Sequence, residues 1–125
     1  MKKILLIEDE KRFSGIIKMR LEASGYEVFT ADDGENGLAK ARDVKPDIVI
    51  CDLLMPKKGG FDVLNGLRKD LQSSVPFIML TCVGDLEKVR KAYDNEADFY
   101  LTKPVDTEVL LKNIRILLSL SKSRH

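Results

Sequence analysis

Acidic, hydroxyl and basic side chains follow several short apolar runs of this sequence, where buried strands would leave a sheet. They are Glu8 and Asp9 after 4–7, Asp52 after 48–51, Thr81 after 76–80, and Lys103 after 99–101. A buried strand holds an unpaired carboxylate only at a high cost, so these residues should lie at the carboxyl ends of their strands. Open α/β sheets bind ligands at that edge, and the pattern therefore predicts one shared site.

The chemistry of this set favours phosphoryl transfer. Clustered carboxylates repel one another unless a cation lies among them, and a hard divalent ion, Mg²⁺ above all, suits oxygen ligands of this kind. A lysine and a hydroxyl beside the metal would bind phosphoryl oxygens, the lysine as a point charge and the threonine as a hydrogen-bond donor. Such a site stabilises charge on a transferring phosphoryl group, with a carboxylate as the nucleophile.

The stretch 48–56 is the expected centre of the site. Four apolar residues run directly into Asp52, as in a central strand of a parallel sheet that is buried on both faces. Pro56 then ends regular pairing, and Gly59-Gly60 allow the chain to turn before the next helix.

Five apolar runs alternate with segments of helical spacing along the chain. The expected strands are 4–7, 28–31, 48–51, 76–80 and 99–101. The expected helices are 11–24, a short one that begins after Asp33 and contains Leu38, Ala39 and Ala41, 61–71, 86–93 and 106–118. Gly25, Asp33 and Asp106 are suitable caps, whereas Gly37 inside the second helix is unfavourable by about 1 kcal/mol relative to alanine. This alternation predicts a parallel sheet with helices on both faces and right-handed crossovers.

Length and composition are those of one globular domain. The chain has 125 residues, of which we expect 1–119 to form the domain and 120–125 a flexible tail or the start of a linker. A formal net charge of +1 gives no argument for binding nucleic acid or a membrane. We find no signal peptide and no membrane span, and therefore expect a cytoplasmic protein in which Cys51 and Cys82 are reduced.

The ordered motifs resemble those of one family. They are Glu8-Asp9, Asp52 followed by Met55-Pro56 and Gly60, Thr81, and Tyr100 three residues before Lys103-Pro104. In this order, the motifs are similar to those of a response-regulator receiver domain, and the resemblance covers essentially the whole chain. It implies a flavodoxin-like, doubly wound fold, with five parallel strands in the order 2-1-3-4-5 and five helices.

The resemblance also implies a role for each site residue. Asp52 would be the phosphoacceptor, while Thr81 and Lys103 would hold the phosphoryl oxygens. Asp9, Asp52 and the backbone carbonyl of Leu54 would ligate Mg²⁺, with Glu8 reaching the ion directly or through water. Tyr100 would turn inward when Thr81 shifts, and the Lys103-Pro104 bond would be cis.

The implied function is a phosphorylation-activated signalling switch, which at most catalyses its own phosphorylation and dephosphorylation. A histidine kinase or phosphotransfer protein would supply the phosphoryl group, and the face of helix 4, strand 5 and helix 5 would control an output. In many receivers this face makes a symmetric dimer; we expect no direct binding of nucleic acid or membrane. The charged residues expected on a solvated face are Lys88, Arg90, Lys91, Asp94, Asp98, Lys112 and Arg115.

Three departures from the family pattern leave alternatives open. The first acid is Glu8 rather than aspartate, Cys82 replaces a small alanine, and Glu96 stands where glycine often ends the fourth helix, so that Asn95 would supply the left-handed cap. The main alternative is a degenerate receiver that acts only as a protein-interaction module.

Two other classes of protein fit the sequence less well. A haloacid-dehalogenase-type phosphohydrolase needs a second aspartate at the position of Leu54. A dinucleotide-binding module needs a G-x-G-x-x-G motif after the first strand, where this chain has acids.

Overall fold

The computed structural model describes residues 1–82 and 97–122. The strands are β1 (Lys3–Ile7), β2 (Glu27–Ala31), β3 (Ile48–Asp52), β4 (Phe77–Cys82) and β5 (Phe99–Lys103). The helices are α1 (Lys11–Ala23), α2 (Gly34–Val44), α3 (Gly60–Asn65) with a π-helical continuation η1 (Gly66–Asp70), and α5 (Thr107–Lys122). The helix predicted at 86–93 and the cap predicted at Asn95 lie outside the described residues.

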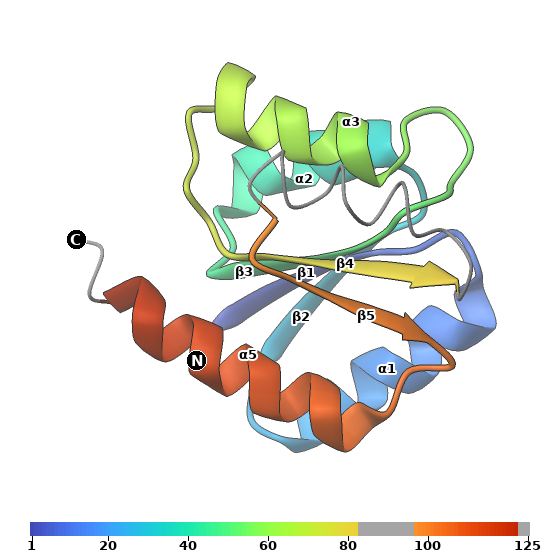
Figure 1. The fold of residues 1–125 in the computed structure, drawn as a ribbon, viewed down its shortest axis with the longest axis vertical. Helices are drawn as coiled ribbons and strands as arrows, with labels where there is room; N and C mark the ends of the chain where they lie inside the picture. Colours follow the sequence, from blue (N-terminus) through green and yellow to red (C-terminus); the bar gives the residue numbers. More distant parts are fainter. Residues whose placement is uncertain (83–96, 123–125) are drawn as a thin grey trace.

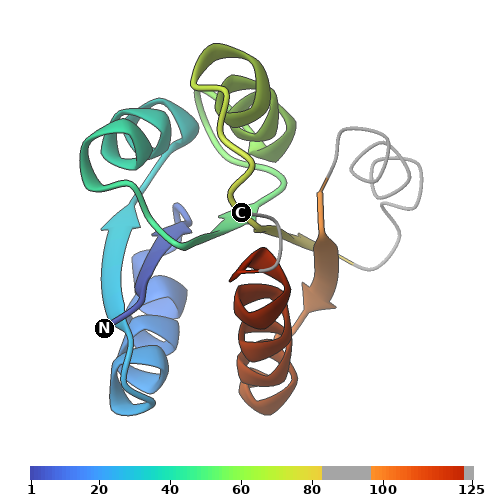
Figure 2. The same cartoon turned by 90° about the vertical axis from the view of Figure 1, so that its left-hand side faces the viewer.

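All five strands are parallel and pair in the order β2-β1-β3-β4-β5, which confirms the predicted doubly wound sheet. Helices α2 and α3 cover one face of the sheet, and α1 and α5 cover the other (Figures 1 and 2). The register places Ile7 beside Cys51, Asp52 beside Leu80, and Cys82 beside Lys103. The carboxyl ends of β1, β3, β4 and β5 therefore meet along one edge.

The continuous apolar runs arise because both faces of the sheet are covered. In β1, Ile4 and Leu6 belong to the cluster under α1 and α5, whereas Leu5 and Ile7 belong to the cluster under α2 and α3. All four side chains are fully buried. Because successive side chains of a strand point to opposite faces, neither set of side chains in this part of β1 faces solvent.

The predicted helix boundaries are close to those of the structure, with two differences. Asp33 caps α2 as predicted, accepting a hydrogen bond from the backbone N–H of Asn36 at 2.7 Å, and Gly25 has a left-handed φ of 96° beyond α1. The segment predicted as 61–71 changes from α-helical to π-helical hydrogen bonding at Gly66. Helix α5 continues to Lys122, past the predicted domain boundary at 119.

Close packing explains the glycine inside α2. A Cβ at Gly37 would lie 2.5 Å from Cδ1 of Ile7, so a side chain there would displace either the buried Ile7 side chain or the helix. The local penalty of glycine is thus tied to a tertiary contact that the sequence alone does not reveal.

Across the described ranges, none of the helices combines the length and apolar character needed to cross a bilayer.

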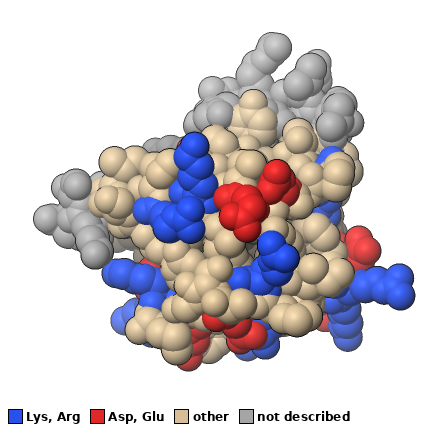
Figure 3. Space-filling view, turned by 90° about the horizontal axis from the view of Figure 1, so that it is seen from below, with Lys and Arg blue, Asp and Glu red and all other residues tan. Residues whose placement is uncertain are grey.

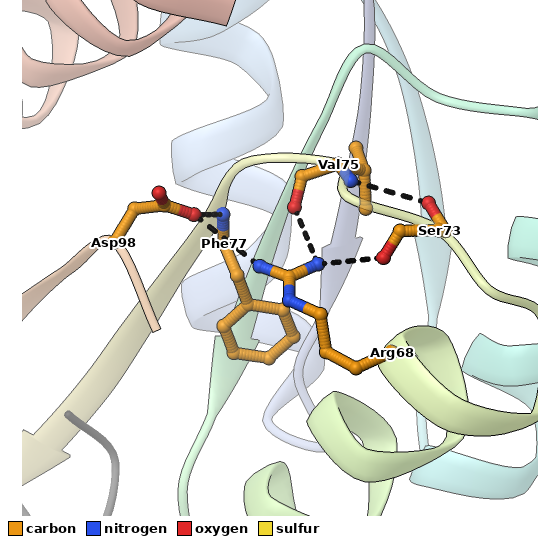
Figure 4. A network of polar contacts seen from close by, with 5 residues as sticks. All are labelled: Arg68, Ser73, Val75, Phe77 and Asp98. Atoms are coloured by element: carbon orange, nitrogen blue, oxygen red, sulfur yellow. Dashed lines mark hydrogen bonds and ion pairs between the residues drawn. The ribbon is translucent and has the colours of Figure 1, made fainter. Parts of the chain in front are cut away.

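At the edge opposite the acidic residues, a buried ion pair joins η1 to β4 and β5 (Figure 4). The Arg68 guanidinium donates to the carbonyls of Ser73 (3.1 Å) and Val75 (2.8 Å) and to the carboxylate of Asp98 (3.3 Å). The same carboxylate oxygen accepts the backbone N–H of Phe77 at 2.8 Å. The prediction that Asp98 lies on a solvated face is therefore wrong, since its side chain is only 12% exposed.

Replacing Arg68 with methionine should lower the free energy of unfolding by about 3–5 kcal/mol, because the Asp98 carboxylate would lose its buried partner. Arg42→Met is the matched control, since Arg42 pairs with Asp43 at 3.6 Å while remaining 66% exposed, and it should cost less than about 1 kcal/mol. Urea denaturation measures both values. Equal losses in the two variants would contradict a structural role for the buried pair.

Candidate functional site

Four of the predicted site residues meet at the carboxyl edge of the sheet. Glu8 and Asp9 directly follow β1, Asp52 is the last residue of β3, and Lys103 is the last residue of β5. The long side chain of Lys103 reaches across the edge, so that its Nζ lies 2.8 Å from Oε1 of Glu8 and 3.2 Å from Oδ2 of Asp52. The structure thus brings one cation against two acids from different strands.

The three acids form a compact oxygen cluster. Carboxylate oxygens of Glu8, Asp9 and Asp52 all lie within 4.8 Å of one another. Glu8 and Asp52 are buried, with 2% and 7% of their surface exposed, whereas Asp9 is exposed. The cluster is therefore open to solvent on the side of Asp9.

Burial is the dominant electrostatic effect at this site. It raises the pKa of Asp52 above its ordinary value, and the charge and hydrogen bond of Lys103 offset this only in part. The pKa of Glu8 is also raised by burial, against the hydrogen bonds from Lys103 and the Glu10 backbone. For Lys103, burial lowers the pKa, but the hydrogen bond to Glu8 and the charge of Asp52 outweigh it, so the net shift is upward. Burial therefore destabilises the charged forms of Glu8 and Asp52, and a bound cation would reduce that cost.

Both carboxylate oxygens of Glu8 already have protein partners. Oε1 accepts from Lys103, and Oε2 accepts the backbone N–H of Glu10 at 3.0 Å. The side chain is therefore held against the start of α1. This arrangement gives Glu8 less freedom than Asp9 to turn toward a ligand.

Phe13, which the sequence analysis did not single out, also contributes to the site. The Nζ of Lys103 lies 4.9 Å from the centroid of the Phe13 ring, in a cation–π contact. Phe13 lies in the first turn of α1, close behind the acidic pair in the sequence, and that proximity is the signal that could have identified it.

Thr81 lies near the end of β4, and Tyr100 lies in β5, three residues before Lys103. Thr81 is 1% exposed, and its hydroxyl donates to the carbonyl of Cys82 at 3.4 Å. Within the described part of the chain, it makes no hydrogen bond to Asp52 or Lys103. Tyr100 is half-buried and packs on the α2/α3 side of the sheet, with its ring centroid 6.3 Å from that of Phe99. The Lys103-Pro104 peptide bond is cis, as predicted.

The loop after β3 lies beside the acid cluster. Its ends are joined by a hydrogen bond from the N–H of Gly60 to the carbonyl of Leu53, at 2.9 Å. Leu54 follows within the loop, and its side chain is 54% exposed. The apolar side chain of Leu54 does not contribute to the core, so the backbone is the part of this residue that could serve the site.

The oxygen donors fit a hard divalent cation. Two buried carboxylates and one exposed carboxylate converge from two strand ends, and a loop backbone lies next to them. Magnesium is commonly held by few carboxylates while keeping several waters, which suits a cluster that is open on one side.

Comparison with known proteins identifies close relatives over nearly the whole chain. The family profile of the response regulator receiver domain matches residues 4–115. The DNA-binding dual master transcriptional regulator RpaA of Synechocystis is 40% identical over 94% of this chain and 49% of its own length. The regulatory protein PhoP of alkaline phosphatase synthesis in Bacillus subtilis is 35% identical over 97% of this chain and 50% of its own. The chain spans about half the length of these curated relatives.

A solved structure agrees with the fold. A response regulator receiver domain protein from Clostridium thermocellum superimposes with a TM-score of 0.94 at 35% identity, and the alignment covers 100% of both chains. The likeness therefore extends beyond the motifs to the complete architecture.

The two cysteines should differ sharply in reactivity. Burial raises the pKa of the Cys51 thiol well above its ordinary value, whereas Cys82 is exposed at the end of β4. Because the thiolate is the reactive form, a thiol reagent such as dithionitrobenzoate should label Cys82 alone in the folded protein, and Cys51 only after unfolding in urea. Cys82→Ser should abolish native labelling, and rapid native labelling that persists in this variant would contradict the assignment.

Proposed function

Because the chain belongs to the response regulator receiver domain family, we propose that it is a phosphorylation-dependent signalling switch with Asp52 as the phosphoacceptor. It is a signalling domain rather than a metabolic enzyme. The observation that carries the proposal is the position of Asp52, which is the last residue of a central strand and lies 3.2 Å from the Lys103 ammonium.

The proposed reaction begins on a histidine kinase or phosphotransfer protein. A carboxylate oxygen of Asp52 attacks the phosphorus of the phosphohistidine, the P–N bond breaks, and an acyl phosphate forms while the imidazole takes back its electron pair. Lys103 supports this step because its ammonium already faces the attacking carboxylate and would neutralise phosphoryl charge. Thr81 would contribute its hydroxyl after turning from the Cys82 carbonyl.

Magnesium would supply further charge neutralisation for the phosphoryl group. Receiver domains generally bind Mg²⁺, and we assign its ligands here to Asp9, Asp52 and the backbone carbonyl of Leu54. Glu8 would act through water, since both of its oxygens already accept hydrogen bonds from Lys103 and Glu10. Asp9, which is exposed, is better able to turn toward an incoming ion.

The output would be read from the predicted face of helix 4, strand 5 and helix 5, of which β5 and α5 belong to the described residues. Tyr100 would respond there to movement of Thr81 and Lys103. An apolar stripe on α5, made of Val109, Ile116 and Leu120, is 39–52% exposed and supports a homodimer through this face. Over the α1 and α5 layer, acidic and basic side chains are interspersed with uncharged areas (Figure 3).

The role of the whole protein is proposed from its relatives. RpaA and PhoP are described as transcriptional regulators, and this chain matches about half of each. We propose that the domain acts in the cytoplasm and controls such an output indirectly, without contacting nucleic acid or membrane itself. A degenerate receiver that only binds other proteins is the alternative, and phosphorylation of Asp52 distinguishes the two.

Incubation with acetyl phosphate and Mg²⁺ should add one phosphoryl group to the wild-type protein and none to Asp52→Asn. The amide is a poor nucleophile and cannot form the acyl phosphate, although it is nearly isosteric with the carboxylate. Intact mass spectrometry measures the product, and Asp62→Asn, on exposed α3 surface, is the matched control. Labelling of Asp52→Asn to the wild-type level would refute the assignment.

Asp9→Ala should weaken Mg²⁺ binding by about tenfold or more, because it removes a direct ligand, whereas Glu8→Gln should have a smaller effect. Titration followed by amide chemical shifts gives both affinities. Equal affinity in Asp9→Ala and the wild type would show that the proposed ligand set is wrong.

A further inference from the structure

The loop between β3 and α3 rests on the first residue of α2. Gly34 is buried, and a Cβ added there would overlap the backbone carbonyl oxygen and carbon of Lys58. The contact is between two backbone segments, so neither partner can yield by changing a rotamer. The absence of a side chain at Gly34 therefore fixes how closely the loop can approach the helix.

The loop is held at its base as well. The Gly60 N–H donates to the Leu53 carbonyl at 2.9 Å, and a Cβ at Gly59 would lie 2.8 Å from the same carbonyl oxygen. With its ends joined and the Lys58 backbone resting on Gly34, the segment has little room to absorb a displacement locally. A shift at Lys58 should therefore be passed to Leu54.

The helix that supports the loop is itself firmly placed. Asp33 is 7% exposed and caps α2 through the Asn36 N–H, and Gly37 lets the helix approach Ile7 of β1. A series of close contacts thus runs from the sheet through α2 to the loop.

An ion pair joins the same two segments but has little weight. Lys57 Nζ lies 3.8 Å from Oδ2 of Asp33, and the lysine side chain is 66% exposed. The Asp33 side chain is only 10% exposed, but a pair at this distance whose lysine remains largely in solvent contributes little to stability. The steric contact at Gly34, rather than this ion pair, should determine where the loop lies.

We propose that Gly34 is a positioning residue for the phosphoacceptor site, which sets the location of the Leu54 carbonyl beside Asp52 and thereby the affinity for Mg²⁺. The inference rests on the proposed function, since it concerns a ligand of the same ion. It adds a residue from α2, an element that supplies none of the proposed ligands.

The test compares Gly34→Ala with two controls. Gly15→Ala makes the same substitution in α1, where a Cβ would meet nothing within 4 Å, and Lys57→Ala removes only the ion pair. Gly34→Ala should weaken Mg²⁺ binding about tenfold, as is typical when the support of a metal ligand is lost, while both controls stay near the wild-type value. Its amide shifts over 53–60 should change even without metal.

A rescue experiment separates positioning from simple loss of structure. At saturating Mg²⁺, the rate of Gly34→Ala labelling by acetyl phosphate should recover to the wild-type rate, with only the Mg²⁺ concentration for half-maximal labelling increased. A variant that is merely misfolded would keep a reduced maximum, and that result would overturn the proposal.

Two further outcomes are distinguishable. Wild-type Mg²⁺ affinity in Gly34→Ala would refute the role of Gly34 while leaving the proposed function intact. Absence of Mg²⁺-dependent labelling in the wild-type protein itself would refute the proposed function and this inference with it.

Discussion

The site depends on one ammonium group placed among acids. Without Lys103, the carboxylates of Glu8 and Asp52 would be buried side by side, and their mutual repulsion would add to the cost of desolvation. The lysine offsets that cost only partly, since the pKa of each acid is still raised. The protein therefore folds with these acids at the edge of the sheet, and the edge keeps a negative potential that Lys103 does not fully neutralise. This potential favours binding of a cation, which in turn favours binding of a phosphoryl group.

The position of the Lys103 ammonium depends on the position of β5. Lys103 is the last residue of β5, and its backbone pairs opposite Cys82 at the end of β4. The opposite end of the same pair of strands is fixed by the Arg68–Asp98 network, in which Asp98 binds both the guanidinium and the Phe77 N–H. A slip in that register would carry Lys103 away from the acids. The buried polar groups at the amino ends of β4 and β5 thus help to keep the register that places Lys103 at the carboxyl edge of the sheet.

Several features were predictable because they are local. The strands could be located because residues buried on both faces form unbroken apolar runs, and the Asp33 cap because its side chain bonds within three residues. The Arg68–Asp98 pair could not be predicted, because the partners are 30 residues apart and Asp98 lies among other charged residues that suggest a solvated surface. Gly37 looked unfavourable inside a helix until the structure placed Ile7 against it, and no local pattern indicated that Gly34 would contact the Lys58 backbone.

The sequence by itself determined the order of strands and helices, the edge at which the acids, Thr81 and Lys103 emerge, and the chemistry that such groups favour. Only the tertiary structure decided which groups meet. Lys103 and Glu8 are 95 residues apart, and their 2.8 Å contact exists because β1, β3, β4 and β5 pair in one register. The same applies to the Phe13 ring beneath the ammonium and to Thr81, whose hydroxyl bonds the Cys82 carbonyl instead of the acids. Local patterns report burial and backbone preference, whereas pairings across a sheet depend on packing that no short stretch encodes.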